Sequence, residues 1–286
     1  MGGRDRAPRV GVVEVDLLLD PFGARWDDVR ATGRLAEEAG FGGLWTWDHL
    51  AGQAHGRDGV LECWTVLSAL AAVTERVMLG PLVLNVANRR PGVLATMAAT
   101  LQEVSDGRLL LGLGAGGGDG TPYPAEQRAL GLDVPADRVR RAQVAETVEV
   151  VRRVWSGTTE PWSGEFQRLD RAEGFLRPDP PPPIVLGGFG PRMMALAGRV
   201  GDGLNTQAGH PRLTELVTAA REAYAEAGRD PAGFLVTVFA GLDRRWVAPN
   251  AAGRARLDEV GVDRVILLVS PPYDRLAIES VAAELA

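Results

Sequence analysis

Three short segments of this 286-residue chain carry residues suited to chemistry, and the first of them pairs an acid with a histidine. The run Trp45-Thr46-Trp47-Asp48-His49 closes an apolar stretch. Because a histidine exchanges protons near neutral pH, we predict that His49 is a catalytic proton donor or acceptor and that Asp48 orients it or a cofactor. The alternative is that Asp48 caps a loop or a helix and that His49 is exposed.

The second segment, from Gly112 to Gly118, is rich in glycine. It contains the spacing Gly-x-Gly-x-x-Gly, but Thr121-Pro122 follows where a dinucleotide-binding fold would begin a helix. We instead predict a strand end whose backbone allows a flat ring or a phosphate to approach closely, and a mobile glycine loop is the alternative. The residues predicted to bind a cofactor here are Ala115, Gly116 and Gly117.

The third segment joins glycines to the expected start of a helix at Pro191. Proline suits the first helical position, and a helix N-terminus presents amide groups to an anion. We predict a phosphate site here, against the alternative of a plain tight turn. The predicted cofactor-binding residues are Gly187, Gly188, Phe189 and Gly190. Near the start of another helix, Arg138, Arg140 and Arg141 are expected on a solvated face, paired with Asp137 or Glu146, and the alternative is that one of them reaches the mouth of the barrel.

The elements that must position these segments follow a regular order. Short apolar runs alternate with helical patterns, and strands that are apolar on both faces indicate a parallel sheet. Eight such units predict one (β/α)₈ TIM barrel over residues 1–286, with a Pro-rich insertion at 157–183 between the fourth helix and the fifth strand. An open doubly wound sheet is the alternative. Strands are expected at 10–17, 41–49, 77–84, 108–115, 184–188, 203–206, 234–242 and 265–270, and helices at 26–39, 61–73, 93–104, 137–155, 191–200, 213–227, 251–260 and 276–285.

Composition excludes several classes of function. All 31 basic residues are arginine, so enzymes that need a Schiff-base or P-loop lysine are excluded. Cys63 is the single cysteine and reads as a buried apolar residue, and the three histidines do not have the spacing of a metal site. A net charge of −6 and the absence of a long apolar run argue against nucleic acid and membrane as partners. We therefore expect a cytoplasmic protein whose chemistry is carried by a cofactor.

Four longer strings occur in a fixed order: FGGLWTWDH at 41–49, TERVMLGP at 74–81, DGRLLLGLG at 106–114 and GPRMMALA at 190–197. In order and spacing, up to about Asn205, they resemble the luciferase-like monooxygenase family. The resemblance implies a TIM barrel that binds FMN or the deazaflavin coenzyme F420. An Asp-His pair at the end of the second strand is more similar to the deazaflavin-dependent branch.

The resemblance also assigns roles to residues of this chain. Asp48 and His49 would face the ring, and the loop 187–190 would hold the phosphate. In the third strand, Pro81 cannot donate a ladder hydrogen bond, which predicts a bulge. The resemblance sharpens this to a cis peptide between Leu82 and Val83 that supports the back of the ring, with Asn85 beside it.

Two departures from the family limit the choice of substrate. In the sugar-phosphate dehydrogenases of this branch, a glutamate follows the glycines of the fourth strand, and Gly117 stands there in this chain. A lysine that would bind the substrate phosphate is replaced by His210. The pocket would lack an acid and a cation, so we expect a neutral small organic substrate rather than a sugar phosphate.

The sequence therefore predicts a coenzyme F420-dependent oxidoreductase that transfers a hydride between the deazaflavin and a small organic molecule. An FMN-dependent monooxygenase is one alternative, and a non-catalytic flavin-binding protein is an alternative of another class. The resemblance also implies a homodimer.

Overall fold

The structure, a computed structural model, describes residues 13–285 and contains a closed parallel barrel. β1 pairs with both β2 and β11, and Leu79 of β3 bridges to Leu109 just before β5. The sheet therefore closes on itself, which excludes the open doubly wound alternative. The strands of the sheet are β1 (Glu14–Leu19), β2 (Gly43–Thr46), β3 (Met78–Pro81), β4 (Leu84–Asn85), β5 (Leu111–Gly114), β8 (Ile184–Gly187), β9 (Gly203–Gln207), β10 (Leu235–Gly241) and β11 (Arg264–Val269).

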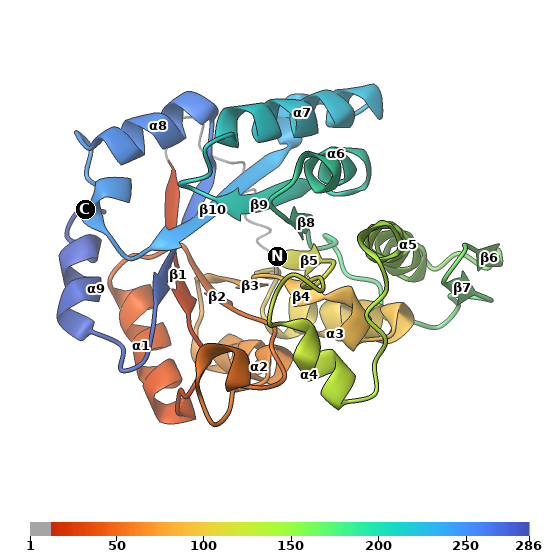
Figure 1. The fold of residues 1–286 in the computed structure, drawn as a ribbon, viewed down its shortest axis with the longest axis horizontal. Coiled ribbons are helices and arrows are strands. Elements are labelled where there is room, and N and C mark those ends of the chain that lie inside the picture. Colours follow the sequence, from red (N-terminus) through yellow and green to blue (C-terminus); the bar gives the residue numbers. More distant parts are fainter. Residues whose placement is uncertain (1–12, 286) are drawn as a thin grey trace.

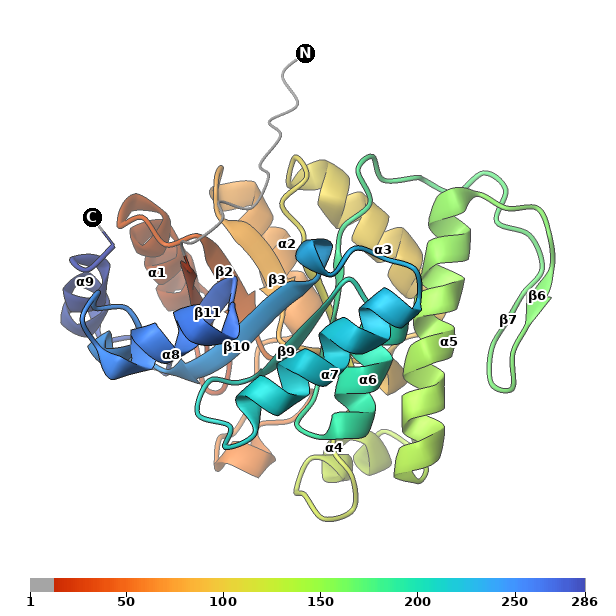
Figure 2. The same cartoon turned by 90° about the horizontal axis from the view of Figure 1, so that it is seen from above.

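Helices surround the barrel on its outside (Figures 1 and 2). β3 and β4 are two parts of one barrel strand, so each barrel strand is followed by a helix, as the eight-unit pattern predicts. The short α4 was not predicted, because six residues are too few to show a helical period. The helices are α1 (Trp26–Glu38), α2 (Cys63–Val73), α3 (Pro91–Val104), α4 (Pro124–Ala129), α5 (Asp137–Ser156), α6 (Pro191–Val200), α7 (Leu213–Glu226), α8 (Ala252–Val260) and α9 (Arg275–Ala282), with 3₁₀ turns η1 (Gln53–His55), η2 (Val86–Asn88), η3 (Pro231–Gly233) and η4 (Arg244–Trp246).

The expected elements match the observed ones to within a few residues. The expected first strand, 10–17, is β1 shifted toward the C-terminus, and its residues 10–12 lie outside the described part of the chain. The expected second strand is shorter, because β2 ends at Thr46 and leaves Asp48 and His49 in the loop that follows.

Two apolar clusters explain why the strands are apolar on both faces. The larger cluster fills the space between the sheet and the helices, and a smaller one fills the barrel interior around Trp45. Trp45 is fully buried, and its indole N–H donates to Asp16 Oδ2 at 2.8 Å. The interior is therefore a packed core and not a pore.

The Pro-rich segment is an insertion between α5 and β8, as predicted. It projects beside α5 and carries a small antiparallel hairpin formed by β6 (Trp162–Ser163) and β7 (Arg168–Leu169) (Figure 2). The carboxylate of Glu146 on α5 accepts hydrogen bonds from three successive amides of this hairpin, at residues 165–167. Glu146 therefore anchors the insertion instead of pairing with the arginines of α5. No helix within residues 13–285 combines the length and the apolar character needed to cross a bilayer.

Candidate active site at the C-terminal mouth of the barrel

A cavity of about 940 Å³ lies at the C-terminal ends of the barrel strands. Its walls come from the loops after β2, β5 and β8, from the turn between β3 and β4, and from the ends of β9 and β10. The three segments singled out in the sequence meet here. The predicted residues that border the cavity are Asp48, His49, Leu82, Val83, Asn85, Ala115, Gly116, Gly117, Gly187, Gly188, Phe189 and Gly190.

His49 is held at the cavity wall by a carboxylate from α4. Its Nδ1 lies 3.1 Å from Glu126 Oε1, and both side chains are largely buried. Glu126 Oε2 accepts hydrogen bonds from the amides of Leu50 at 2.8 Å and Ala51 at 3.2 Å. Burial alone would raise the pKa of Glu126, but the hydrogen bonds from His49 and these amides outweigh it and lower the pKa below its ordinary value. Glu126 therefore stays ionised beside His49 at neutral pH.

Glu126 corrects the expectation that this pocket lacks an acid. Gly117 occupies the position expected to carry a glutamate, and a Cβ there would lie 2.5 Å from Thr121 Oγ1 and 2.8 Å from Tyr123 Cβ. The loop after β5 therefore has no room for a side chain at Gly117. The acid comes instead from the next helix along the chain.

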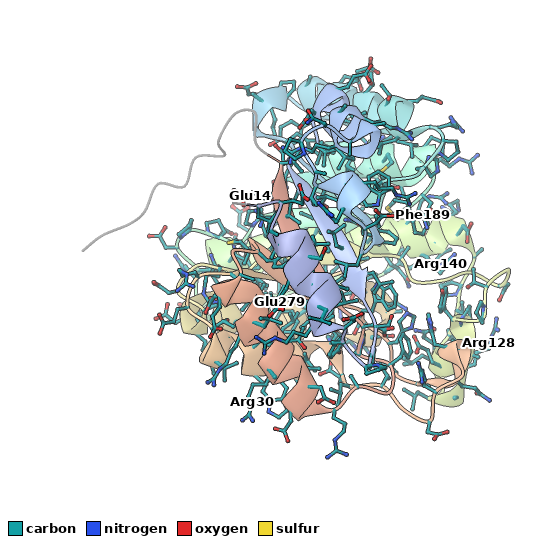
Figure 3. All side chains as sticks on the ribbon, turned by 90° about the vertical axis from the view of Figure 1, so that its left-hand side faces the viewer. Glu14, Arg30, Arg128, Arg140, Phe189 and Glu279 are labelled. Atoms are coloured by element: carbon teal, nitrogen blue, oxygen red, sulfur yellow. The ribbon has the colours of Figure 1, made fainter. Side chains whose placement is uncertain are left out.

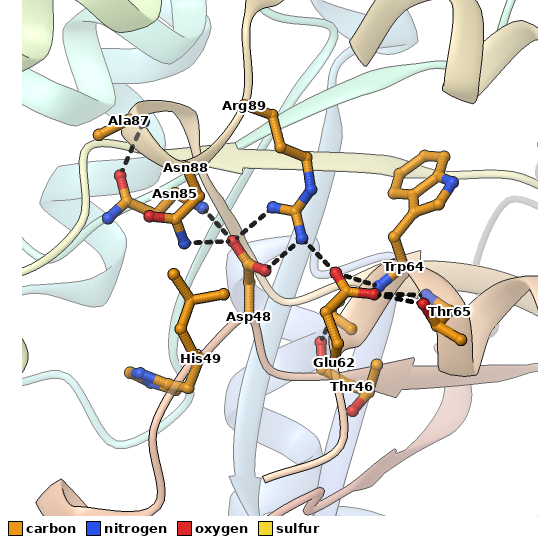
Figure 4. Close-up of polar contacts among 12 residues, drawn as sticks. Thr46, Asp48, His49, Glu62, Trp64, Thr65, Asn85, Ala87, Asn88 and Arg89 are labelled. Carbon is orange, nitrogen blue, oxygen red and sulfur yellow. Dashed lines mark hydrogen bonds and ion pairs between the residues drawn. The ribbon is translucent and has the colours of Figure 1, made fainter. Parts of the chain in front are cut away.

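The carboxylate of Asp48 orders the loop after β4. It accepts hydrogen bonds from both terminal nitrogens of Arg89, at 2.8 and 2.9 Å, from Asn88 Nδ2 and from the amide of Asn85 (Figure 4). Its side chain is fully buried, and Arg89 also pairs with Glu62. These contacts give the Asp48 carboxylate a positioning role, and its contact with a bound ring stays a prediction. His49 is not the exposed residue of the alternative.

The floor of the cavity is formed where the third barrel strand is interrupted. The peptide between Leu82 and Val83 is cis, which confirms the prediction. A Cβ added to Gly114 would lie 2.6 Å from Val83 Cγ2, and one added to Gly187 would lie 2.7 Å from the same atom. These glycines therefore make room for the side chain of Val83, and both also border the cavity.

The loop after β8 offers amide groups to an anion. Among the described residues, the amides of Phe189, Gly190 and Arg192 donate no hydrogen bond to the protein. A Cβ added to Gly190, which precedes the first turn of α6, would meet no atom within 4 Å. At Gly188, by contrast, a Cβ would lie 2.6 Å from Met193 Cγ. Gly188 is therefore required for packing, whereas Gly190 faces open space that a phosphate fits.

Arg140 departs from the solvated face expected for the arginines of α5, although it pairs with Asp137 as predicted and Arg138 is 74% exposed. Its side chain is 10% exposed, and Nη1 donates to the carbonyl oxygens of Ala115 at 2.9 Å and Gly116 at 2.6 Å. Gly116 adopts a φ of +66°, and a Cβ there would lie 2.4 Å from Asn85 Nδ2. Arg140 thus contacts the glycine loop at the cavity wall, which argues against the mobile-loop alternative. It lies on the same side of the barrel as Phe189 (Figure 3).

Other candidates from the sequence lie away from the cavity. Cys63 is fully buried, and burial raises the pKa of its thiol well above the ordinary value. His210 accepts a hydrogen bond from the amide of Arg212 and does not border the cavity. Within residues 13–285, no group of three or more His, Cys, Asp or Glu residues is placed to hold a metal ion.

Comparison with known proteins places the chain in a family. Residues 11–242 match the family described as luciferase-like monooxygenase, and the chain therefore belongs to that family. An F420-dependent glucose-6-phosphate dehydrogenase of Nakamurella multipartita is 36% identical over 198 residues, which cover 68% of this chain and 57% of that protein. A 5,10-methylenetetrahydromethanopterin reductase of Archaeoglobus fulgidus is 30% identical over 84% of this chain and 66% of that protein.

The chain spans somewhat more than half the length of the first of these relatives. Among solved structures, an F420-dependent secondary alcohol dehydrogenase in complex with an F420-acetone adduct superposes with a TM-score of 0.80 and 21% sequence identity. That superposition covers 96% of this chain and 99% of that one. It confirms the TIM-barrel fold.

Proposed function

We propose that this chain is a coenzyme F420-dependent oxidoreductase that transfers a hydride between the deazaflavin and a small organic substrate. The observation that carries the proposal is the His49–Glu126 pair at the edge of a cavity whose floor is Val83. The F420-dependent relatives described above support the choice of cofactor. When bound, the deazaflavin supplies the centre that gives or accepts the hydride.

The protein's own residues would bind and orient this group. Leu82 and Val83 would lie behind the ring, and the amides around Gly190 would hold the phosphate, with Phe189 at the rim. Asn85 Nδ2, which makes no described hydrogen bond, is a donor for a polar edge of the ring. The cradle fits because the space in front of Gly190 is open and the amides beside it have no protein acceptor.

His49 would handle the proton that accompanies hydride transfer. A carbonyl oxygen that becomes a hydroxyl gains one proton, and an imidazole at the cavity wall is placed to deliver it or, in the reverse direction, to remove it. Glu126 fixes the orientation of the imidazole through its contact with Nδ1. This function accounts for the burial of an ionised glutamate beside His49.

A neutral substrate remains part of the proposal. The first relative is named for a sugar phosphate, but this chain contains no lysine. Three arginines border the cavity: Arg140 already binds two carbonyl oxygens and Asp137, Arg192 adjoins the loop proposed to hold the cofactor phosphate, and Arg141 is the third. Beside His49, the charged group is the carboxylate of Glu126. We therefore propose an uncharged organic substrate.

The predicted homodimer would be tested by light scattering of the purified chain.

Cofactor titration tests the proposal. Oxidised F420 and FMN are titrated into the purified protein at equal ionic strength and followed by fluorescence quenching. We expect F420 to bind at low micromolar concentration or below, and FMN much more weakly. Tighter binding of FMN would overturn the assignment and favour the monooxygenase. Stoichiometric binding of F420 without turnover of any alcohol or ketone would favour a non-catalytic binding protein.

A further inference from the structure

Five aromatic rings gather at one end of the cavity, and the proposed function does not use most of them. Phe22 stacks on His55 with centroids 3.9 Å apart, and Trp47 lies 5.7 Å from His55. Tyr123 lies 5.0 Å from His49 and 6.0 Å from His55, nearly parallel to the latter. We call these five residues the aromatic cluster. It combines loops after β1, β2 and β5 with η1.

Two members of the aromatic cluster keep polar groups without a protein partner. Among the described residues, the two ring nitrogens of His55 make no hydrogen bond to the protein, and the hydroxyl of Tyr123 makes none either. Both side chains border the cavity. Burial, and then the nearby His49, lower the pKa of His55. At neutral pH, His55 is therefore an uncharged ring that offers both a donor and an acceptor.

The charges at this end are unsuited to an anion. Glu126, which lies beside His49, is ionised and largely buried. An anionic substrate group in contact with His49 would be repelled by Glu126, whereas an uncharged carbonyl or hydroxyl would not. The wall therefore favours flat aromatic faces and neutral oxygen atoms.

We propose that the aromatic cluster is the substrate subsite and that it takes a planar, conjugated, uncharged ketone or the corresponding alcohol. The inference rests on the proposed function. Reduction of such a ketone breaks the C=O π bond, forms a C–H bond with hydride from the reduced deazaflavin, and forms an O–H bond with a proton from His49. The two electrons come with the hydride, so the deazaflavin is oxidised by two electrons. His55 and Tyr123 are positioning residues that stack on the substrate and bind its oxygen.

The test compares two ketones of nearly equal size that differ in planarity. Acetophenone and cyclohexyl methyl ketone are titrated by ligand-observed NMR into the protein with oxidised F420, where no reduction can occur, and into the protein without cofactor. Ring stacking predicts roughly threefold to tenfold tighter binding of acetophenone. With reduced F420, the same preference should appear in KM.

Variants identify the wall responsible for the preference. Tyr123→Leu should reduce the preference for acetophenone to about one, whereas Tyr123→Phe, which keeps the ring, should retain most of it. The matched control is Phe175→Leu in the Pro-rich insertion, which does not border the cavity and should leave the preference unchanged. Thermal unfolding of each variant verifies that it folds.

The outcomes separate this inference from the proposed function. If F420 binds but the protein does not distinguish the two ketones, the aromatic subsite is wrong and the proposed function stands. If F420 binds and glucose 6-phosphate binds more tightly than acetophenone, both the aromatic subsite and the uncharged substrate are wrong, and only F420-dependent hydride transfer stands. If F420 does not bind but acetophenone is preferred in the protein without cofactor, the proposed function falls and the subsite stands. A preference that persists in Tyr123→Leu would also overturn the assignment.

Discussion

Each end of the barrel has a buried carboxylate paired with a basic side chain, but the two pairs differ in their surroundings. Near the N-terminal end, the buried carboxylate of Asp16 accepts hydrogen bonds from Trp45 and, at 2.7 Å each, from two nitrogens of Arg264. Near the C-terminal end, Glu126 pairs with His49, whose ring borders an open cavity.

The difference lies in how completely the polar groups satisfy one another. At the N-terminal end, where a cavity of about 1330 Å³ reaches Arg264, the acid, indole and guanidinium satisfy one another, so this network offers little to a ligand. At the C-terminal end, the amides beside Gly190 and the polar atoms of His55 have no protein partner among residues 13–285. Spare hydrogen-bonding capacity, and not the presence of charged residues, distinguishes the proposed active site from the structural end of the same barrel.

The largest expected effect comes from removing the imidazole at the C-terminal end. His49→Ala should lower turnover by roughly a hundredfold to ten-thousandfold, the usual contribution of a general acid or base. The affinity for F420 should stay within a few-fold of the original, because the lost interaction forms mainly in the transition state. Stopped-flow kinetics and fluorescence titration measure the two quantities. An unchanged turnover number would assign His49 a passive role, and loss of F420 binding would make it a ring contact.

Breaking the network at the N-terminal end should affect stability instead of chemistry. Arg264→Met leaves the fully buried Asp16 without its cation, which should lower the free energy of unfolding by about 3–5 kcal/mol. Arg275→Met removes an exposed ion pair with Glu279 and should cost less than about 1 kcal/mol.

Urea denaturation at fixed pH measures both losses, and F420 affinity should be unchanged in both proteins. Equal stability losses in the two variants would show that the buried network contributes no more than a surface pair.

A smaller effect is expected at Glu126. Glu126→Gln should lower turnover about tenfold, because a neutral amide offers the proton-handling imidazole no negative charge. Since the pKa of Glu126 is lowered in the folded protein, its stabilising contribution is present above the ordinary glutamate pKa and is lost as the pH falls through the lowered value.

The difference in unfolding free energy between the original protein and Glu126→Gln should therefore shrink in acid. A turnover number equal to that of the original protein would remove Glu126 from the proton-handling group.

Much of the fold was predictable because local signals agree with the tertiary structure. Pro191 and Gly201 frame α6, which begins and ends as predicted, and repeated strand–helix alternation predicted the barrel. Pro81 marked the interruption of the third strand for a physical reason, since it cannot donate to the ladder.

The partners of the site residues were not predictable from local patterns. Glu126 lies 77 positions from His49, on a helix of six residues, and in the sequence it reads as an ordinary surface acid. Arg89 lies 41 positions from Asp48 and carries no local sign of its buried ion pair. The pairing of Arg140 with Asp137 was predicted, but its burial was not, because its other acceptors are main-chain carbonyl oxygens, which a sequence does not show.

The packing of Val83 has a consequence for laboratory evolution of this protein. Its Cγ2 atom fills the space that Cβ atoms at Gly114 and Gly187 would occupy. A library that varies one position at a time will therefore reject side chains at 114 and 187, whatever their benefit to a new ligand. Combining Val83→Gly with Gly114→Ala or Gly187→Ala should give folded proteins in which position 114 or 187 carries a side chain. The floor of this cavity can therefore be reshaped only by coordinated substitutions.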